Sequence, residues 1–197
     1  MKLAYVTIFD PLDIRNWSGI SYYLAKALEN QSISLDYIGP LEEKLTQLSD
    51  LNKSLYGKPV KKEHMAWMEP TVLRDFAQQV SRKLANSDAD IVFSLGSSQI
   101  AYLESEKPIV YTWDTTFAGS LDYPMNSNLS AEAINLGNDC EQRALDKCKL
   151  AIFPSEWARQ VALDHYKVDK SKVKVVPFGA NLSCRRSEER RVGKECV

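Results

Sequence analysis

The chain has 197 residues, 44% of them apolar, and a formal net charge of −1. A chain of this length and composition can bury one substantial core, which excludes a disordered protein for the bulk of it. The charge offers no basic field for nucleic acid, and no apolar run approaches the roughly 18 residues of a transmembrane segment. Because the N-terminus carries no signal-peptide pattern, we expect a cytoplasmic enzyme or small-molecule binding protein.

The first predicted element is a buried strand over residues 2–9. Apolar residues at helical spacing begin at Ile20, so Ser18 or Gly19 marks the N-terminus of a helix directly after this strand. At such a turn, backbone N–H groups point toward the sheet edge, and glycine lets a ligand come close. A glycine before a helix is more often plain capping, so the turn alone identifies no site.

The next two strands are expected over residues 34–39 and 90–95. Between them, a leucine stripe predicts an amphipathic helix over residues 41–55, and the charged segment 60–64 predicts a short edge element. A second apolar stripe predicts a helix over residues 70–86. This alternation of strands and helices favours an α/β fold.

The alternation continues with a strand over residues 108–113, a loop over 121–129 and a long helix over 130–147. Cys140 and Cys148 lie eight positions apart on a predicted helix, which separates them by about 12 Å, too far for a disulfide. We therefore interpret them as packed thiols of a reducing compartment. No metal site is predicted, because the histidines have no partners at a ligand spacing.

On the same long helix, Glu141 and Arg143 carry opposite charges two positions apart. Charged helix residues usually face solvent. We therefore interpret them as a solvated surface rather than as a catalytic pair.

Residues 149–182 contain one complete strand, helix and strand unit. An apolar run over 150–153 predicts a buried strand, Ser155 predicts the N-cap of a helix, and the valines of 173–176 predict a second strand. A strand that crosses through a helix to a parallel neighbour is the basic unit of doubly wound folds. The chain is therefore predicted to form a Rossmann-like, mostly parallel sheet with helices on both faces.

Small or polar residues follow four of the predicted strands. Open parallel sheets bind ligands outside the carboxyl ends of their strands, so these residues should converge on one crevice. Asp114 could accept hydrogen bonds from a sugar hydroxyl or act as a base, or it could serve only as a local turn residue. The residues expected at the crevice are Gly19, Gly96, Asp114 and Ser155.

Several segments together resemble the N-terminal half of family four glycosyltransferases, which have the GT-B fold. The resemblance covers about residues 2–182 and rests on the Gly19 turn, DIVFSLGSSQIAYL, KPIVYTWDTTFAG and above all FPSEWARQVALDHYKVDKSKVKVVPFGAN. Enzymes of this family transfer a sugar from a nucleotide-sugar donor to an acceptor, with retention at the anomeric carbon and without a bound metal. They use two Rossmann-like domains, with the acceptor mainly on the N-terminal one.

The resemblance implies that Ser18 and Gly19 face the donor phosphates or the transferred sugar, although Ser18 replaces one of the paired glycines common in the family. The implied substrates are a nucleotide sugar and a carbohydrate or lipid-linked acceptor, with no cofactor and no metal. The resemblance assigns no catalytic residue. On the acceptor side, the implied cleft residues are Gly96, Ser97, Asp114, Thr115, Ser155 and Trp157.

The family's donor-binding half, with two glutamates separated by seven residues, should follow residue 182, yet no Glu of this chain has another Glu eight positions on. We therefore expect a truncated, inactive enzyme: one domain over residues 1–182, then a disordered, non-native tail over 183–197. A cleft face without its partner domain would favour self-association through exposed aromatic residues, namely Trp17, Trp113, Phe117 and Trp157.

The alternative is a stand-alone Rossmann-like module that binds a small molecule or a protein without catalysis. A dehydrogenase is disfavoured because no GxGxxG follows the first strand, and a P-loop NTPase because GxxxxGK[ST] is absent. Peripheral membrane association stays open: many relatives act on lipid-linked acceptors, but the sequence shows no basic amphipathic helix.

Overall fold

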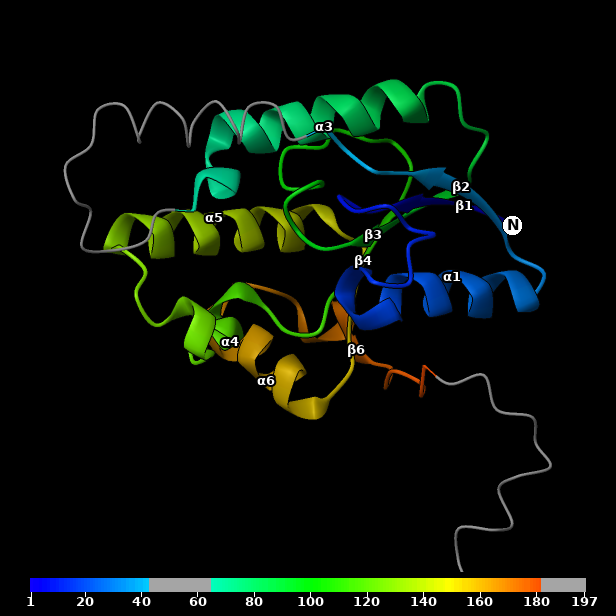
Figure 1. The fold of residues 1–197 in the computed structure, drawn as a ribbon. Coiled ribbons are helices and arrows are strands. Elements are labelled where there is room, and N and C mark those ends of the chain that lie inside the picture. Colours follow the sequence, from blue (N-terminus) through cyan, green and yellow to red (C-terminus); the bar gives the residue numbers. More distant parts are fainter. Residues whose placement is uncertain (43–64, 182–197) are drawn as a thin grey trace, which may run out of the picture.

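The structure, a computed structural model, describes residues 1–42 and 65–181. Its core is a six-stranded parallel sheet with the strand order β2-β1-β3-β4-β5-β6 (Figure 1). This confirms the predicted Rossmann-like α/β fold. The strands are β1 Lys2–Val6, β2 Ser34–Ile38, β3 Ile91–Leu95, β4 Ile109–Thr112, β5 Leu150–Phe153 and β6 Val173–Val175.

Helices and short 3₁₀ turns connect the strands on both faces of the sheet. The helices are α1 Ile20–Asn30, α3 Pro70–Leu84, α4 Phe117–Ser120, α5 Ala131–Lys147 and α6 Glu156–His165. The 3₁₀ turns are η1 Asn16–Gly19, η2 Ala66–Met68, η3 Pro124–Asn126 and η4 Lys170–Lys172.

The two faces of the sheet are covered unequally. On one face, α1 packs through Ala25 against Leu3, Tyr5 and Phe93. On the other face, α3, α5 and α6 share one core with alternate residues of the strands, and Figure 1 shows α3 and α1 on opposite sides of the sheet. The apolar stripe of α3 is fully buried there, at Val72, Phe76, Val80 and Leu84.

Most predicted elements are confirmed within one to three residues, with two differences. The strand predicted over 2–9 ends at Val6, because its partner β2 ends opposite it at Ile38, before Gly39 and Pro40. The loop predicted over 121–129 contains η3, and α4 precedes it; elements this short have no periodicity to detect. The predicted helix 41–55, edge element 60–64 and tail 183–197 lie outside the described residues, apart from the first two positions of that helix.

The strand order positions the site. From β1 the chain passes to β2 on one side and then returns to β3 on the other, so the topological switch point lies between β1 and β3. Parallel α/β sheets bind ligands at this point, outside the carboxyl ends of the strands. The predicted crevice residues follow β1, β3, β4 and β5, which are neighbours in the sheet.

The two cysteines on or next to α5 are buried and free, as predicted. Burial raises the pKa of the Cys148 thiol to about 11 and that of Cys140 still further. Both thiols are therefore protonated at neutral pH and behave as packing groups. None of the helices within residues 1–42 and 65–181 has the length and apolar content needed to cross a membrane.

Candidate functional site

A cavity of about 580 Å³ lies at the carboxyl ends of β1, β3 and β4, beside the switch point. Its walls are largely apolar and aromatic, with contributions from Phe9, Trp17, Trp67, Trp113 and Phe117. A small set of polar groups comes from the turns after β3 and β4 and from α5: Ser97, Gln99, Asp114, Thr115, Thr116 and Glu141. An apolar pocket with a few convergent polar groups is the usual form of a small-molecule site.

Two tryptophans form a rigid part of this wall. The rings of Trp17 and Trp113 are stacked, with centroids 4.0 Å apart and planes at 16°. The Trp17 indole N–H donates to the Asp114 carboxylate, and Phe178 packs edge-on against Trp17 at 5.7 Å. The tryptophan pair is therefore held from the β1–α1 turn, from the end of β4 and from the segment that follows β6.

The β1–α1 turn has an unusual backbone. Three successive residues have positive φ: Trp17 at 46°, Ser18 at 53° and Gly19 at 78°. Only glycine adopts this region without cost, so Ser18 stores on the order of 1 kcal/mol of strain. Asn181 stabilises the turn by donating to the Ser18 carbonyl at 2.9 Å. Trp17 lines the cavity, whereas Ser18 and Gly19 lie next to it in the chain and outside its lining.

The turn after β3 is built around a glycine and a buried amide. Gly96 has a φ of 107°, which a side chain rarely tolerates, and a Cβ there would lie 3.2 Å from the Gln99 side-chain oxygen. The Gln99 amide donates to the Leu95 carbonyl and accepts from the Ser98 hydroxyl at 3.0 Å. Gly96 and Ser97 thus reach the cavity as part of a turn fixed from within.

Glu141 forms the buried end of the cavity, and its interpretation as a solvated residue is wrong. Its side chain is 2% exposed. The Tyr111 hydroxyl donates to Oε1 at 2.7 Å, and the Ser97 hydroxyl and the Phe117 backbone N–H also hydrogen-bond to the carboxyl group. Burial, with a smaller contribution from the Asp114 charge, outweighs these bonds and raises the pKa of Glu141 to about 7.

A signal for this burial is present in the sequence. Glu141 follows Gly137 by four positions and precedes Ala144 and Leu145 by three and four, so it lies within the apolar stripe of α5, which is buried at these positions. A carboxylate inside an apolar stripe is rarely left without partners. Arg143 does face outward, where it pairs with Asp139 at 2.7 Å.

Asp114 combines the two roles that the sequence left open. Its Oδ1 accepts the Thr115 backbone N–H at 2.9 Å, which is a local turn interaction. It also lines the cavity and receives the Trp17 indole N–H. Partial burial raises its pKa above the ordinary value for an aspartate, while these hydrogen bonds act in the opposite direction.

Thr115 and Thr116 continue from Asp114 into α4. The Thr116 hydroxyl accepts the Gly119 N–H at 3.5 Å as the N-cap of that helix. The Thr115 hydroxyl is buried and finds no hydrogen-bond partner among residues 1–42 and 65–181. It lies so close to Gly119 that a Cβ at position 119 would be only 2.2 Å away.

Ser155 and Trp157 lie outside the cavity lining. The Ser155 hydroxyl accepts the Ala158 N–H at 3.1 Å and so caps α6, as its sequence position predicts. Trp157 is 51% exposed at the start of α6. Phe117, in contrast, is only 6% exposed, so the expectation of an exposed ring is wrong; its ring is enclosed because it packs against Gly137.

Replacing Ser155 with alanine is expected to lower the free energy of unfolding by about 1 kcal/mol, the usual value of an N-cap hydroxyl. Ser130→Ala is the matched control, because Ser130 caps α5 through an identical 3.1 Å bond to the Ala133 N–H. Urea denaturation of both variants checks this. A loss at Ser155 well above that at Ser130 would contradict a purely capping role.

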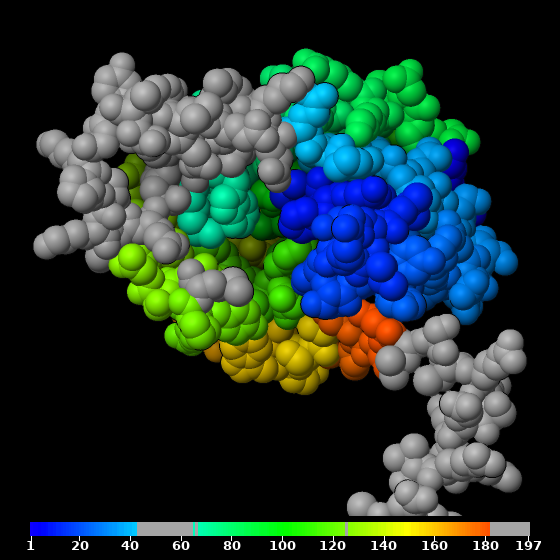
Figure 2. All heavy atoms as spheres, viewed as in Figure 1, coloured from blue at the N-terminus to red at the C-terminus, as the bar shows by residue number. Residues whose placement is uncertain are grey.

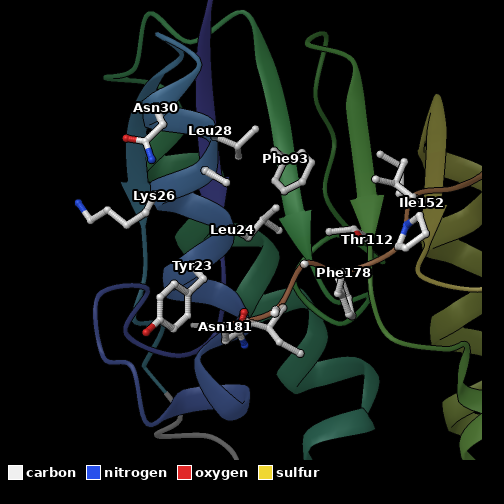
Figure 3. Close-up of a pocket in the computed structure, with 16 residues that line it drawn as sticks. Tyr23, Leu24, Lys26, Leu28, Asn30, Phe93, Thr112, Ile152, Phe178 and Asn181 are labelled. Atoms are coloured by element: carbon white, nitrogen blue, oxygen red, sulfur yellow. The ribbon is translucent and has the colours of Figure 1, made fainter. Parts of the chain in front are cut away.

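A second hollow, of about 550 Å³, lies beside α1 and was not predicted (Figure 3). Its lining includes Phe93, Thr112 and Ile152 from the part of the sheet that extends past α1. The segment from Val176 to Asn181 borders it and lies against the N-terminal part of the molecule, as the orange and blue atoms of Figure 2 show. Its lining is largely apolar, and among the described lining residues only Lys26 is charged.

An open parallel sheet with helices on both faces and a cavity at its switch point defines a Rossmann-like α/β domain. Residues 20–183 match the family described as Glycosyltransferase Family 4, and the chain belongs to this family. No curated protein matches the chain. The family match confirms the resemblance identified from the sequence and supports sugar-related substrates.

Proposed function

We propose that this chain is the acceptor-binding N-terminal half of a retaining glycosyltransferase that transfers a hexose from a nucleotide-sugar donor. The observation that carries the proposal is the cavity at the switch point, whose lining combines the Asp114 carboxylate with hydroxyl-bearing and aromatic side chains. Carboxylate and hydroxyl groups in an apolar setting suit the binding and orientation of a polyol.

In this proposal, the cavity holds the acceptor so that one hydroxyl points out of it toward the donor. Asp114 accepts a hydrogen bond from the acceptor, and Trp17 fixes the orientation of that carboxylate through its indole N–H. Holding the acceptor in this way lowers the entropy cost of bringing two substrates together. Glu141 holds Ser97 and the first residue of α4 in place through its hydrogen bonds.

The donor is bound elsewhere in this scheme. Stabilising an oxocarbenium-like transition state and a departing nucleotide diphosphate requires groups that bind phosphate. None of the described residues that line the cavity is Lys, Arg or His. We therefore propose that the donor-binding groups belong to a second domain and that the 197-residue chain alone has little or no transferase activity.

The test is to sequence the source gene past the codon for Leu182 and to express any longer product beside this chain. Both proteins are then incubated with a panel of nucleotide sugars, with and without acceptors, and nucleotide release is measured. Release by the longer product alone is the expected result. Equal release by the 197-residue chain would contradict the proposal that the donor-binding groups belong to a second domain. A gene that ends at Val197, together with no nucleotide-sugar binding, would favour a binding module.

A further inference from the structure

We infer that the cavity at the switch point selects an uncharged glycoside as its acceptor and discriminates against phosphorylated sugars. The inference rests on the proposed function, because it names the acceptor class of that same site. Three features of the cavity carry it: a preformed tryptophan wall, a floor that holds two carboxyl groups, and a lining without cations among the described residues.

Because each tryptophan ring covers one face of the other, a sugar ring can pack only against an outer face of this pair. The C–H groups on one face of a pyranose carry partial positive charge and pack against the electron-rich face of an indole. Trp17 and Trp113 are already stacked at 4.0 Å, and Phe178 and Asp114 hold Trp17 from two further sides. A wall fixed before binding loses little conformational entropy when the ligand arrives, which favours affinity.

The floor suits hydroxyl groups. Sugar hydroxyls both donate and accept, so they can donate to the carboxylate of Asp114, which is half-buried and lines the cavity. Each such bond replaces one that the free sugar makes with water. A neutral ligand can therefore satisfy this floor without bringing in a charge.

The same floor disfavours a phosphate. A phosphate monoester carries a charge of about −1.5 to −2 at pH 7. Beside the Asp114 carboxylate, that charge would be repelled and would also lose its hydration in a partly buried site. The cavity therefore discriminates against phosphate both by repulsion from a carboxylate and by the lack of an attracting cation. The two effects together give stronger discrimination than either alone.

The described surroundings supply no compensating cation. Phosphate recognition normally uses Arg, Lys or the N-terminus of a helix. The described lining contains no Lys, Arg or His. Arg74 and Arg143 lie over the ring of Tyr102, which does not line the cavity.

The experiment compares matched ligand pairs on the 197-residue chain. The probes are the methyl glycosides of glucose, galactose and mannose and the 6-phosphates of the same glycosides. Binding is measured by saturation-transfer NMR and by tryptophan fluorescence titration. We expect at least one neutral glycoside to bind. We expect its 6-phosphate to bind with an affinity lower by a factor of about ten or more. We also expect saturation transfer to be strongest at the ring C–H protons that face the tryptophans.

Substitutions at two cavity positions, Trp113 and Asp114, assign the effect to the cavity. Trp113→Leu should weaken glycoside binding about tenfold, Trp113→Phe should retain part of the affinity, and Tyr22→Leu is the control, since this α1 tyrosine does not line the cavity. Asp114→Asn should reduce the preference for the neutral ligand over its phosphate, because it removes a repelling charge. A merely structural role for Asp114 would leave that preference unchanged.

Equal or tighter binding of the 6-phosphates would overturn the inference, and so would the absence of glycoside binding. Neither result bears on the proposed function, which is tested separately by nucleotide release from the longer product. Nucleotide release with acceptors of another class would sustain the proposed function while the inference fails. No release by the longer product, with glycosides bound as expected, would leave the cavity selective and the transferase assignment wrong.

Discussion

Replacing Glu141 with alanine is expected to lower the free energy of unfolding by about 3 kcal/mol, because it leaves several buried donors without an acceptor. The Tyr111 hydroxyl, the Ser97 hydroxyl and the Phe117 backbone N–H all hydrogen-bond to this carboxyl group. Each unpaired buried donor costs about 1–3 kcal/mol, and the low end applies here because water can enter from the cavity. Urea denaturation at pH 6 measures the loss.

The control for this variant is Glu132→Ala, which removes an exposed carboxylate from the first turn of the same helix. That change should cost less than about 1 kcal/mol, the usual range for a charge near a helix N-terminus. Equal losses at the two positions would show that burial and hydrogen bonding of Glu141 contribute little to stability.

Glu141 also makes the free energy of unfolding decrease as the pH rises, whereas a carboxyl group with a lowered pKa has the opposite effect. Its pKa is raised from 4.5 in the unfolded chain to about 7 in the folded protein, so between these values the folded state binds the additional proton. Stability therefore falls as the pH rises through this window, by about 3 kcal/mol for this group alone. Glu141→Gln removes the titration, so the stability of the wild-type protein relative to this variant should decline from pH 5 to pH 8.

Other groups act mostly outside this window. The pKa values of Asp13, Asp36 and Asp88 are lowered by partners such as Arg15 and Lys2, so their contribution is lost only as the pH falls through more acidic values. A stability difference between wild type and Glu141→Gln that stays constant from pH 5 to pH 8 would contradict the assignment of the pH dependence to Glu141.

The fold could be predicted from the sequence because its determinants are local. The caps at Ser130 and Ser155 hydrogen-bond only three residues ahead, and the helix that begins at Ile20 follows directly from its glycine N-cap. Apolar runs of four or five residues then place each strand. The errors lie where a partner element ends first, as at Val6, and in elements too short to show periodicity, namely α4 and η3.

The site was harder to predict because it depends on contacts between distant segments. Glu141 is buried through Tyr111, 30 residues earlier, and a charge on a helix is more often solvated. Ser155 follows β5 at the same edge of the sheet as the other predicted residues. The cavity, however, lies at the ends of β1, β3 and β4, so Ser155 does not line it. The second hollow depends on Asn181 reaching Ser18, 163 positions away, which no local pattern encodes.

The sharpest test of packing at the site is Gly137→Ala, for which two simple rules disagree. Helix propensity favours alanine over glycine by about 1 kcal/mol in a helix interior. The added Cβ, however, would lie 2.2 Å from Cζ of Phe117 and 2.4 Å from Cε1 and Cε2. These separations are far below van der Waals contact, and the ring is enclosed in a buried cluster with Leu73, Ala101 and Cys140.

The cost of overpacking should exceed the gain in helix propensity, because relieving the overlap requires either α5 or the Phe117 ring to move at a cost of about 1–3 kcal/mol. We expect a net destabilisation of about 1 kcal/mol or more in urea denaturation. Gly179→Ala is the matched control: a Cβ there meets nothing within 4 Å, so the change should be neutral or stabilising by up to about 1 kcal/mol. If Gly137→Ala were as stable as wild type, the Phe117 ring would have to shift freely, and it could not be a fixed part of the cavity wall.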